Sequence, residues 1–155
     1  MQVKLKVLFL IIRGILKYQY WIDPRIIYAQ MWHETGGFKS KIFLENNNLV
    51  GMKKNSRPYD IGVNRGHAVY PSLWANVKCF FERQIQFKVF PSDIITYLTN
   101  TQKSGYAEDK KYIERVVNVY EREKSRLNNV GILALPIVIG LPIGLYFLIK
   151  KSIKW

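Results

Sequence analysis

One carboxylate of this sequence is placed where it could act as a general acid. Glu34 ends the segment PRIIYAQMWHE, in which Ile27, Met31 and Glu34 follow the i, i+4, i+7 spacing of one helix face. An ionisable group on an apolar stripe, in the last turn where the helix dipole is negative, is expected to have a raised pKa. A raised carboxyl pKa suits an acid that works near neutral pH. On position alone, a solvated glutamate at a helix end is the alternative.

The residues around this glutamate form two spaced motifs. AQMWHETGGFKS fits the pattern A-Q-x-x-x-E-[ST]-G-x-x-x-S, and NNLVGMK fits N-N-x-x-G-x-K after a short spacer. HAVYPSLWANVKCF and GYAEDKKYIERVVNVYE follow as weaker matches. In this order the motifs resemble the bacterial endo-β-N-acetylglucosaminidases, the flagellar and autolysin-type peptidoglycan hydrolases of glycoside hydrolase family 73. The resemblance covers about residues 23–121.

This resemblance implies an α+β, mainly helical fold of the lysozyme-like superfamily, with a small β lobe across a cleft from a helical bundle. It implies that Glu34 is the catalytic acid, which protonates the leaving oxygen of a β-1,4 bond in the glycan backbone. Asparagine side chains can also hold a loop by hydrogen bonds, and any single tyrosine is as easily a core residue. The side chains expected to bind substrate or to line the cleft are Gln30, Asn47, Asn48, Tyr70, Tyr106 and Tyr112.

A second carboxylate is harder to assign, although glycoside hydrolysis usually needs two. Asp60, in RPYDIG, is the better candidate catalytic residue, whereas Glu45 is expected at the surface. Three mechanisms stay open: Asp60 positions a water, the substrate's acetamido group acts as nucleophile, or a single glutamate serves a lytic transglycosylase. The absence of a G-L-M-Q-type segment weighs against the last. Outside catalysis, the alternative is a wall-binding structural protein that has lost activity.

The composition indicates a polyanionic partner. The formal net charge is +13, which attracts nucleic acid, anionic lipid or an anionic cell-wall polymer. Because the basic residues are scattered without a binding motif, we do not expect nucleic acid. His33 and His67 lack a ligand cluster and no phosphate loop is present, so neither a metal nor a cofactor is expected. The single cysteine, Cys79, is expected to be buried in an apolar stretch.

The elements that must position these residues follow from local signals. Asp23-Pro24 is typical of a helix start, and Gly36-Gly37 of a helix end. A short irregular hairpin is expected around Asn64-Arg65-Gly66. An amphipathic helix packed on the domain is expected near the start, with a degenerate signal or anchor as the alternative. The ranges are 3–18 for that helix, 57–72 for the hairpin, and 73–87, 91–100 and 110–126 for later helices.

The C-terminal run VGILALPIVIGLPIGLYFLI, residues 130–149, carries no charge. As a helix it would span roughly 30 Å, the hydrocarbon thickness of a bilayer. Lysines and a final Trp155 follow, as at a helix end anchored in headgroups. We therefore expect a lysozyme-like glucosaminidase domain at 1–128 and a transmembrane helix with a basic tail at 129–155. A buried core helix is the alternative.

These expectations describe a single-pass membrane protein with a C-terminal anchor, whose catalytic domain faces the cell wall. Its expected partners are peptidoglycan strands and, through residues 130–149, a lipid bilayer. By analogy, such a hydrolase would suit a larger envelope machine or a phage particle that contains a lipid membrane.

Overall fold

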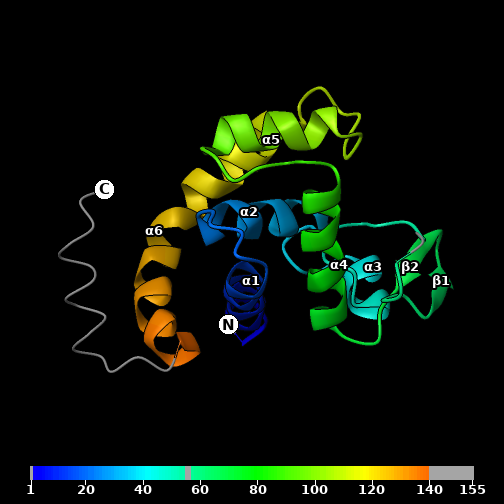
Figure 1. The fold of residues 1–155 in the computed structure, drawn as a ribbon, viewed down its shortest axis with the longest axis horizontal. Coiled ribbons are helices and arrows are strands. Elements are labelled where there is room, and N and C mark those ends of the chain that lie inside the picture. Colours follow the sequence, from blue (N-terminus) through cyan, green and yellow to red (C-terminus); the bar gives the residue numbers. More distant parts are fainter. Residues whose placement is uncertain (1, 55–56, 140–155) are drawn as a thin grey trace.

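The computed structural model describes residues 2–54 and 57–139, which form a helical bundle with a small sheet at one side (Figure 1). Helices dominate, and the two strands form one antiparallel pair, as expected for a lysozyme-like α+β domain. The elements in chain order are α1 (Gln2–Tyr18), α2 (Pro24–Glu34), α3 (Lys41–Asn46), β1 (Gly62–Asn64), β2 (His67–Val69), α4 (Leu73–Gln86), α5 (Ile94–Lys103) and α6 (Tyr112–Ile139).

The first helix, α1, packs along one apolar face, as the sequence predicts. Its inward side buries Val7, Leu8, Ile11 and Ile12 against α2, α4 and α6. Gly14 allows a close approach to α4, since a Cβ at this position would come within 2.2 Å of the Phe81 ring. This helix is therefore part of the domain core.

The second helix, α2, is the central element of the bundle. Asp23 caps it by accepting a 2.9 Å hydrogen bond from the Arg25 amide, and Pro24 occupies the first helical position. Six consecutive residues, 26–31, are buried, so neighbours surround this helix on all sides. Its most extensive contact is with α6. A helix enclosed in this way holds its last residue, Glu34, in a fixed position.

The hairpin of the small lobe has the predicted turn. Asn64 pairs with His67, and the two residues between them, Arg65 and Gly66, have φ values of 53° and 74°. Two successive left-handed residues match the right-handed twist of a two-residue hairpin. The Ala68 amide donates to the Met52 carbonyl at 2.9 Å, which ties the hairpin to the loop after α3. The sequence reasoning missed α3 itself, whose N-cap is Ser40.

Three helices complete the domain. Ser72 caps α4 and Asp93 caps α5, and both helices lie within a few residues of their predicted bounds. The last helix, α6, extends to Ile139, well beyond the predicted end at residue 126. Within the part of the chain that the structure describes, no helix combines the length and apolar character needed to cross a membrane. Residues 140–149 of the predicted transmembrane run lie outside the described residues, so that run stays a prediction.

Candidate active site

Glu34 lies where α2 meets the start of α6 and the loop that follows α3. Its carboxylate oxygen Oε2 is 3.8 Å from the position that a Cβ on Gly51 would occupy. The Tyr112 hydroxyl at the start of α6 hydrogen-bonds to the same carboxyl group. The side chain is partly exposed, so it remains accessible to a ligand. Glu34 thus combines an enclosed setting with an open side.

The pKa of Glu34 is raised to about 7, as the sequence analysis predicted. Burial is the main cause, because it removes hydration that stabilises the ionised carboxylate more than the neutral acid. The hydrogen bond from Tyr112 acts in the other direction and lowers the pKa, since the O–H donor favours the ionised form. The balance leaves a substantial protonated fraction at neutral pH, as a general acid requires.

A buried hydrogen-bond chain supports this tyrosine. Gln30 Nε2 donates to the Tyr112 hydroxyl at 2.9 Å, and the Tyr97 hydroxyl donates to Gln30 Oε1 at 3.1 Å. Gln84 on α4 donates to Tyr97 at 2.6 Å. The chain connects α4, α5 and α2 to α6 and ends at Glu34. Sequence reasoning missed Tyr97 and Gln84, because no local signal distinguishes them from other polar residues of a helix.

The expectation that Gln30 and Tyr112 contact substrate is wrong for their positions in this structure. Gln30 is fully buried and Tyr112 is 2% exposed. Both side chains use their polar atoms within the protein: Gln30 bridges two tyrosines, and Tyr112 bonds to Gln30 and Glu34. Through these hydrogen bonds, the two side chains connect the Glu34 carboxyl group to the buried interior.

Tyr106 lies beside Tyr112 and the loop that follows α3. Its hydroxyl donates to the Val50 carbonyl at 3.1 Å, and its ring lies 6.0 Å from that of Tyr112. The Arg83 guanidinium lies 4.8 Å from the Tyr106 ring centroid. Because Tyr106 is partly exposed, a contact with a sugar stays a prediction for this residue.

The asparagine run organises the loop that reaches Glu34. Asn48 Nδ2 donates to the carbonyls of Met52 at 2.9 Å and Ala68 at 3.0 Å, while its Oδ1 accepts from the amides of Val50 and Met52. This one side chain fixes both ends of the turn that contains Gly51, whose φ is +61°. The prediction that asparagines hold the loop is confirmed, but Asn48 is 1% exposed and has no face left for substrate.

The two asparagines that precede Asn48 attach the same loop to the hairpin and its flank. Asn47 has a left-handed φ of 51° at the end of α3, and its Nδ2 donates to the Tyr70 carbonyl at 2.9 Å. Asn46, which the sequence reasoning did not single out, is buried and donates to the Asn64 carbonyl at 3.0 Å. Asn47 is partly exposed, so its contact with substrate stays a prediction.

Tyr70 is a core residue, which corrects the expectation that it binds substrate. It is 1% exposed, and its hydroxyl lies 3.5 Å from both Met52 Sδ and Cys79 Sγ. Cys79 is itself buried, as predicted. These soft, apolar neighbours fill the space between α4 and the small lobe and leave the Tyr70 ring no accessible surface.

The two other carboxylates occupy the small lobe. Asp60 lies in the loop just before β1 and is partly exposed. Burial and the neighbouring Cys79 raise the pKa of the Tyr70 hydroxyl, and the charge of Asp60 adds to this effect. Within the described residues, no hydrogen bond or ion pair joins Asp60 to Glu34, and a catalytic role for Asp60 stays a prediction. Glu45 is exposed, and Arg65 Nε donates to it at 2.8 Å, which lowers the pKa of its carboxyl group. The prediction of a surface Glu45 is confirmed.

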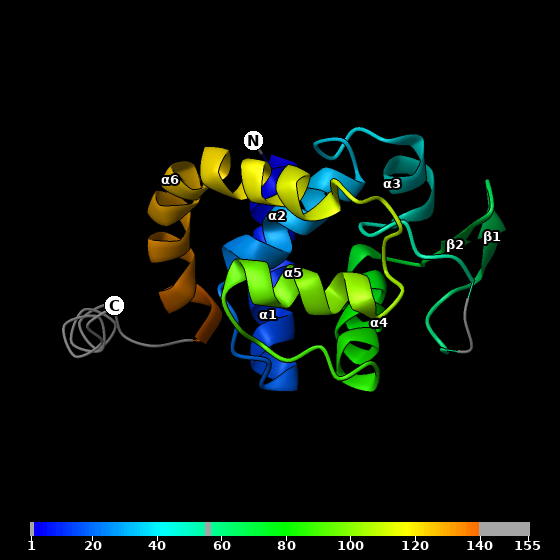
Figure 2. The ribbon, with the colours of Figure 1, turned by 90° about the horizontal axis from the view of Figure 1, so that it is seen from above.

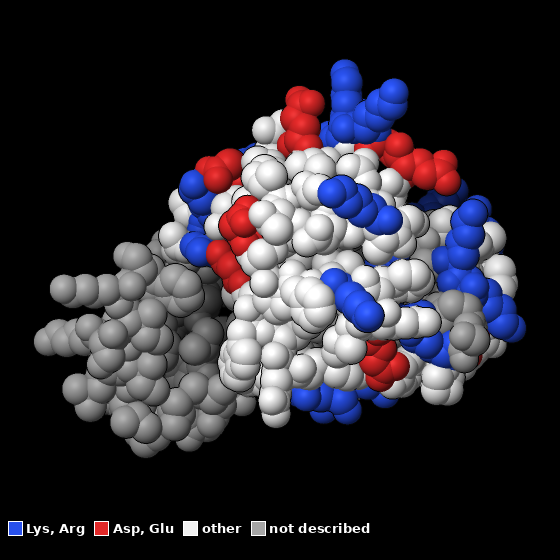
Figure 3. Space-filling model, turned by 45° about the horizontal axis from the view of Figure 1, so that its top comes forward, with Lys and Arg blue, Asp and Glu red and all other residues white. Residues whose placement is uncertain are grey.

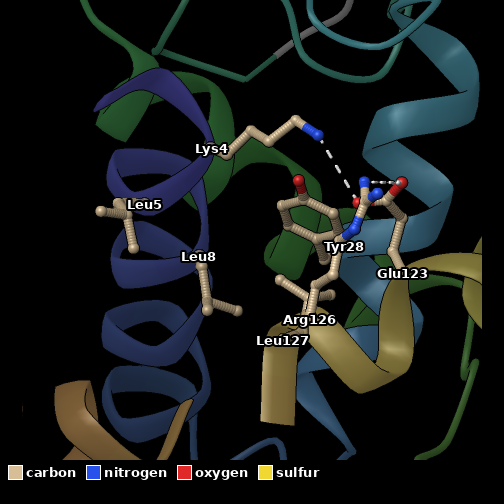
Figure 4. A pocket seen from close by; sticks show the side chains of 7 residues that line it. All are labelled: Lys4, Leu5, Leu8, Tyr28, Glu123, Arg126 and Leu127. Atoms are coloured by element: carbon tan, nitrogen blue, oxygen red, sulfur yellow. Dashed lines mark hydrogen bonds and ion pairs between the residues drawn. The ribbon is translucent and has the colours of Figure 1, made fainter. Parts of the chain in front are cut away.

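A pocket of about 140 Å³ lies away from this site, between α1, α2 and α6 (Figure 4). Tyr28 points into it, and its buried hydroxyl has no hydrogen-bond partner among the described residues. Glu123 lies beside it and pairs with Lys4 at 3.5 Å. Because Glu123 follows Tyr112 by three turns of α6, roughly 16 Å along the helix, the pocket is separate from the Glu34 site. The lining residues are Lys4, Leu5, Leu8, Tyr28, Glu123, Arg126 and Leu127.

Comparison with known proteins agrees with this geometry. The family model described as mannosyl-glycoprotein endo-beta-N-acetylglucosaminidase matches residues 15–125, which include Glu34, the asparagine run, the hairpin and Tyr112. No curated protein and no solved structure matches the chain significantly. The family match covers well over half of the chain and contains every residue of the site described above. The chain therefore belongs to the glucosaminidase family and is a glycoside hydrolase that acts on peptidoglycan.

Proposed function

We propose that Glu34 is the general acid with which this hydrolase cleaves the β-1,4 glycan backbone of peptidoglycan. The observation that carries the proposal is a partly exposed carboxyl with a pKa raised to about 7, fixed at the end of a buried helix. Its proton passes to the leaving glycosidic oxygen, and the carboxylate that results accepts the hydrogen bond from Tyr112. That bond costs nothing to form during the reaction, because Gln30 already holds the tyrosine in place.

The second half of the reaction is assigned to a water molecule that Asp60 positions. Asp60 is favoured because it precedes β1 in the small lobe and remains partly exposed. Two alternative mechanisms begin with the same proton transfer from Glu34. The acetamido group of the substrate can act as nucleophile, or the sugar's own hydroxyl can attack, as in a lytic transglycosylase. Mass analysis of digested muropeptides separates the transglycosylase route from the two hydrolytic routes: we expect a reducing N-acetylglucosamine end, and an anhydro-muramic product would refute hydrolysis.

The direct test of Glu34 is cell-wall digestion by matched variants. Glu34→Gln keeps the shape of the side chain and removes its proton, so turnover should fall by about 10²–10⁴-fold. Glu45→Gln is the matched control, because Glu45 is an exposed carboxylate bonded to Arg65 and should keep wild-type activity. Equal loss in both variants, or no loss in Glu34→Gln, would contradict the assignment. A wild-type chain that binds walls but does not digest them would favour a wall-binding protein without activity.

We also propose that residues 130–149 anchor the enzyme in a membrane with its domain toward the wall. The support is the uncharged length of this run and the lysines that follow it. Full-length protein should then resist carbonate washing of membranes, whereas a chain ending at Asn128 should stay in solution and still digest walls. A full-length chain that washes off would refute the anchor and leave the hydrolase assignment intact.

The biological setting that we propose is an envelope-crossing assembly, such as a phage particle that contains a lipid membrane. The net charge of +13 supports attraction to anionic wall polymers and lipids. Lysine and arginine side chains are spread over the face seen in Figure 3, with acidic groups between them. Such scattering fits attraction to an extended polyanion better than a single docking site. Immunogold labelling of purified particles or envelopes tests this setting, and label confined to the cytoplasm would refute it.

A further inference from the structure

Five large apolar side chains are exposed in the α1–α2 loop, at the end of α4, in the α4–α5 loop and at the start of α5. Trp21 and Phe90 are each 67% exposed, which is unusual for aromatic rings of this size on a soluble surface. They belong to the α1–α2 loop and the α4–α5 loop. We call the set of Trp21, Ile85, Phe87, Phe90 and Ile95 the apolar face.

A hydrogen bond joins the two loops that carry the aromatic rings. The Tyr20 hydroxyl donates to the Val89 carbonyl, and both residues are buried. Trp21 and Phe90 each follow one of these buried residues, so both rings emerge beside the same junction. Figure 2 shows the α1–α2 loop, the end of α4 and the α4–α5 loop along one edge of the molecule. The apolar face is therefore one surface that the fold assembles from separate segments.

The charges around this face are mainly positive. Lys17 at the end of α1 and Lys88 between Phe87 and Phe90 are both exposed, and Asp93 is the exposed acid close by in sequence. Exposed aromatic rings among lysines and arginines are the composition of surfaces that lie in a bilayer interface. Two copies of this chain joined through the face would bring like charges together. Anionic headgroups would complement them.

The path of α6 indicates where a bilayer would lie. Figure 2 shows that the last described turns of α6 run toward the same side of the molecule as the apolar face. The sequence continues from residue 139 for ten more uncharged positions. A chain anchored through this run would bring the apolar face, and not the small lobe, against the lipid.

From these observations we infer that the apolar face rests in the headgroup region of an anionic bilayer and orients the enzyme on it. The inference rests on the anchor proposed above. Since α2 begins beside Trp21 and Glu34 is its last residue, 11 residues along, the acid would lie farther from the lipid, by at most the helix length of roughly 15 Å. The face would thereby point the site toward the wall.

Spin labels on the full-length chain in phosphatidylcholine–phosphatidylglycerol vesicles test this orientation. Labels are placed at Trp21→Cys and Phe90→Cys, with Leu44→Cys and Ile61→Cys as controls that are equally exposed but lie in α3 and before β1. The native Cys79 is buried, so it should not react. We expect labels 21 and 90 to collide several-fold more often with oxygen than with a water-soluble nickel complex, and the controls to show the reverse.

Three outcomes would overturn the inference. The first is water-like collision rates at all four positions. The second is spin–spin broadening at 21 or 90 that appears without lipid and disappears on dilution with unlabelled chain, since it would assign the face to a second copy. The third is an unchanged immersion depth of labels 21 and 90 in anionic vesicles when Lys17→Glu is combined with Lys88→Glu. Wall digestion by the same samples separates these results from a failure of the hydrolase, because none of the altered residues lies at Glu34.

Discussion

The raised pKa of Glu34 predicts a specific dependence of protein stability on pH. The folded state holds this carboxyl at a pKa of about 7, compared with an ordinary value of 4.5 in an exposed chain. Ionisation is therefore harder in the folded state than in the unfolded state. The stability associated with the neutral acid is fully present below pH 4.5 and is lost as the pH rises through 7.

The size of this effect follows from the shift itself. One pKa unit corresponds to about 1.36 kcal/mol, so ionising Glu34 should cost the folded state about 3 kcal/mol above pH 7. This is an upper value, because the side chain is partly exposed and solvent screens part of the cost. Gln cannot ionise. The free energy of unfolding of Glu34→Gln minus that of the wild type should therefore increase by up to this amount between pH 4.5 and pH 8.

Urea unfolding at several pH values measures the difference directly. Wild type and Glu34→Gln are compared in the same detergent, with tryptophan fluorescence as the signal and Glu45→Gln as control. Groups that titrate in both proteins cancel in the comparison, so only Glu34 contributes to the pH dependence of the difference. The control should show no such gain, because hydrogen bonds from Arg65 and Asn64 lower the pKa of Glu45.

A difference in unfolding free energy that stays constant from pH 4.5 to 8 would refute the reasoning. It would mean that Glu34 titrates alike in the folded and unfolded chains and is a solvated helix-end residue. A difference that falls with rising pH would mean that Tyr112 outweighs burial and depresses the pKa. In either case the chain would need another acid at neutral pH.

Further predictions concern four other side chains. Tyr112→Phe removes the hydrogen bond that lowers the pKa of Glu34, so the high-pH limb of the activity profile should move upward; a limb that moves downward would contradict this. Asp60→Asn should slow turnover at unchanged stability, and wild-type turnover would remove Asp60 from the catalytic residues. Tyr28→Phe deletes a buried hydroxyl that has no hydrogen-bond partner among the described residues, and it should raise the free energy of unfolding by about 1 kcal/mol in thermal or urea melts; a loss of stability would show that the hydroxyl is bonded. Asn48→Ala strands the carbonyl of Ala68 and the amides of Val50 and Met52, and should cost about 2–3 kcal/mol by the same measurement; a change below 0.5 kcal/mol, roughly that of a surface substitution, would contradict the role of Asn48 in the loop.

The sequence determined the features that depend on a few neighbouring residues. Asp23-Pro24 predicts the start of α2 because the cap and the proline act within one turn. Asn64-Arg65-Gly66 predicts the hairpin because the turn needs residues that accept a left-handed backbone. The spacing of Ile27, Met31 and Glu34 predicts a carboxyl on an apolar stripe, and the motifs around it predict the family.

Only the tertiary structure decided which polar residues of the motifs can reach a ligand. Gln30, Asn48 and Tyr70 are polar enough to bind a sugar, yet the fold buries each of them. Their exposure depends on segments far away in sequence: Gln30 on Tyr97 and Tyr112, Asn48 on Ala68. No local pattern encodes such a partner. A hydrogen-bonding side chain is equally suited to substrate and to protein, and long-range packing alone determines which of them it meets.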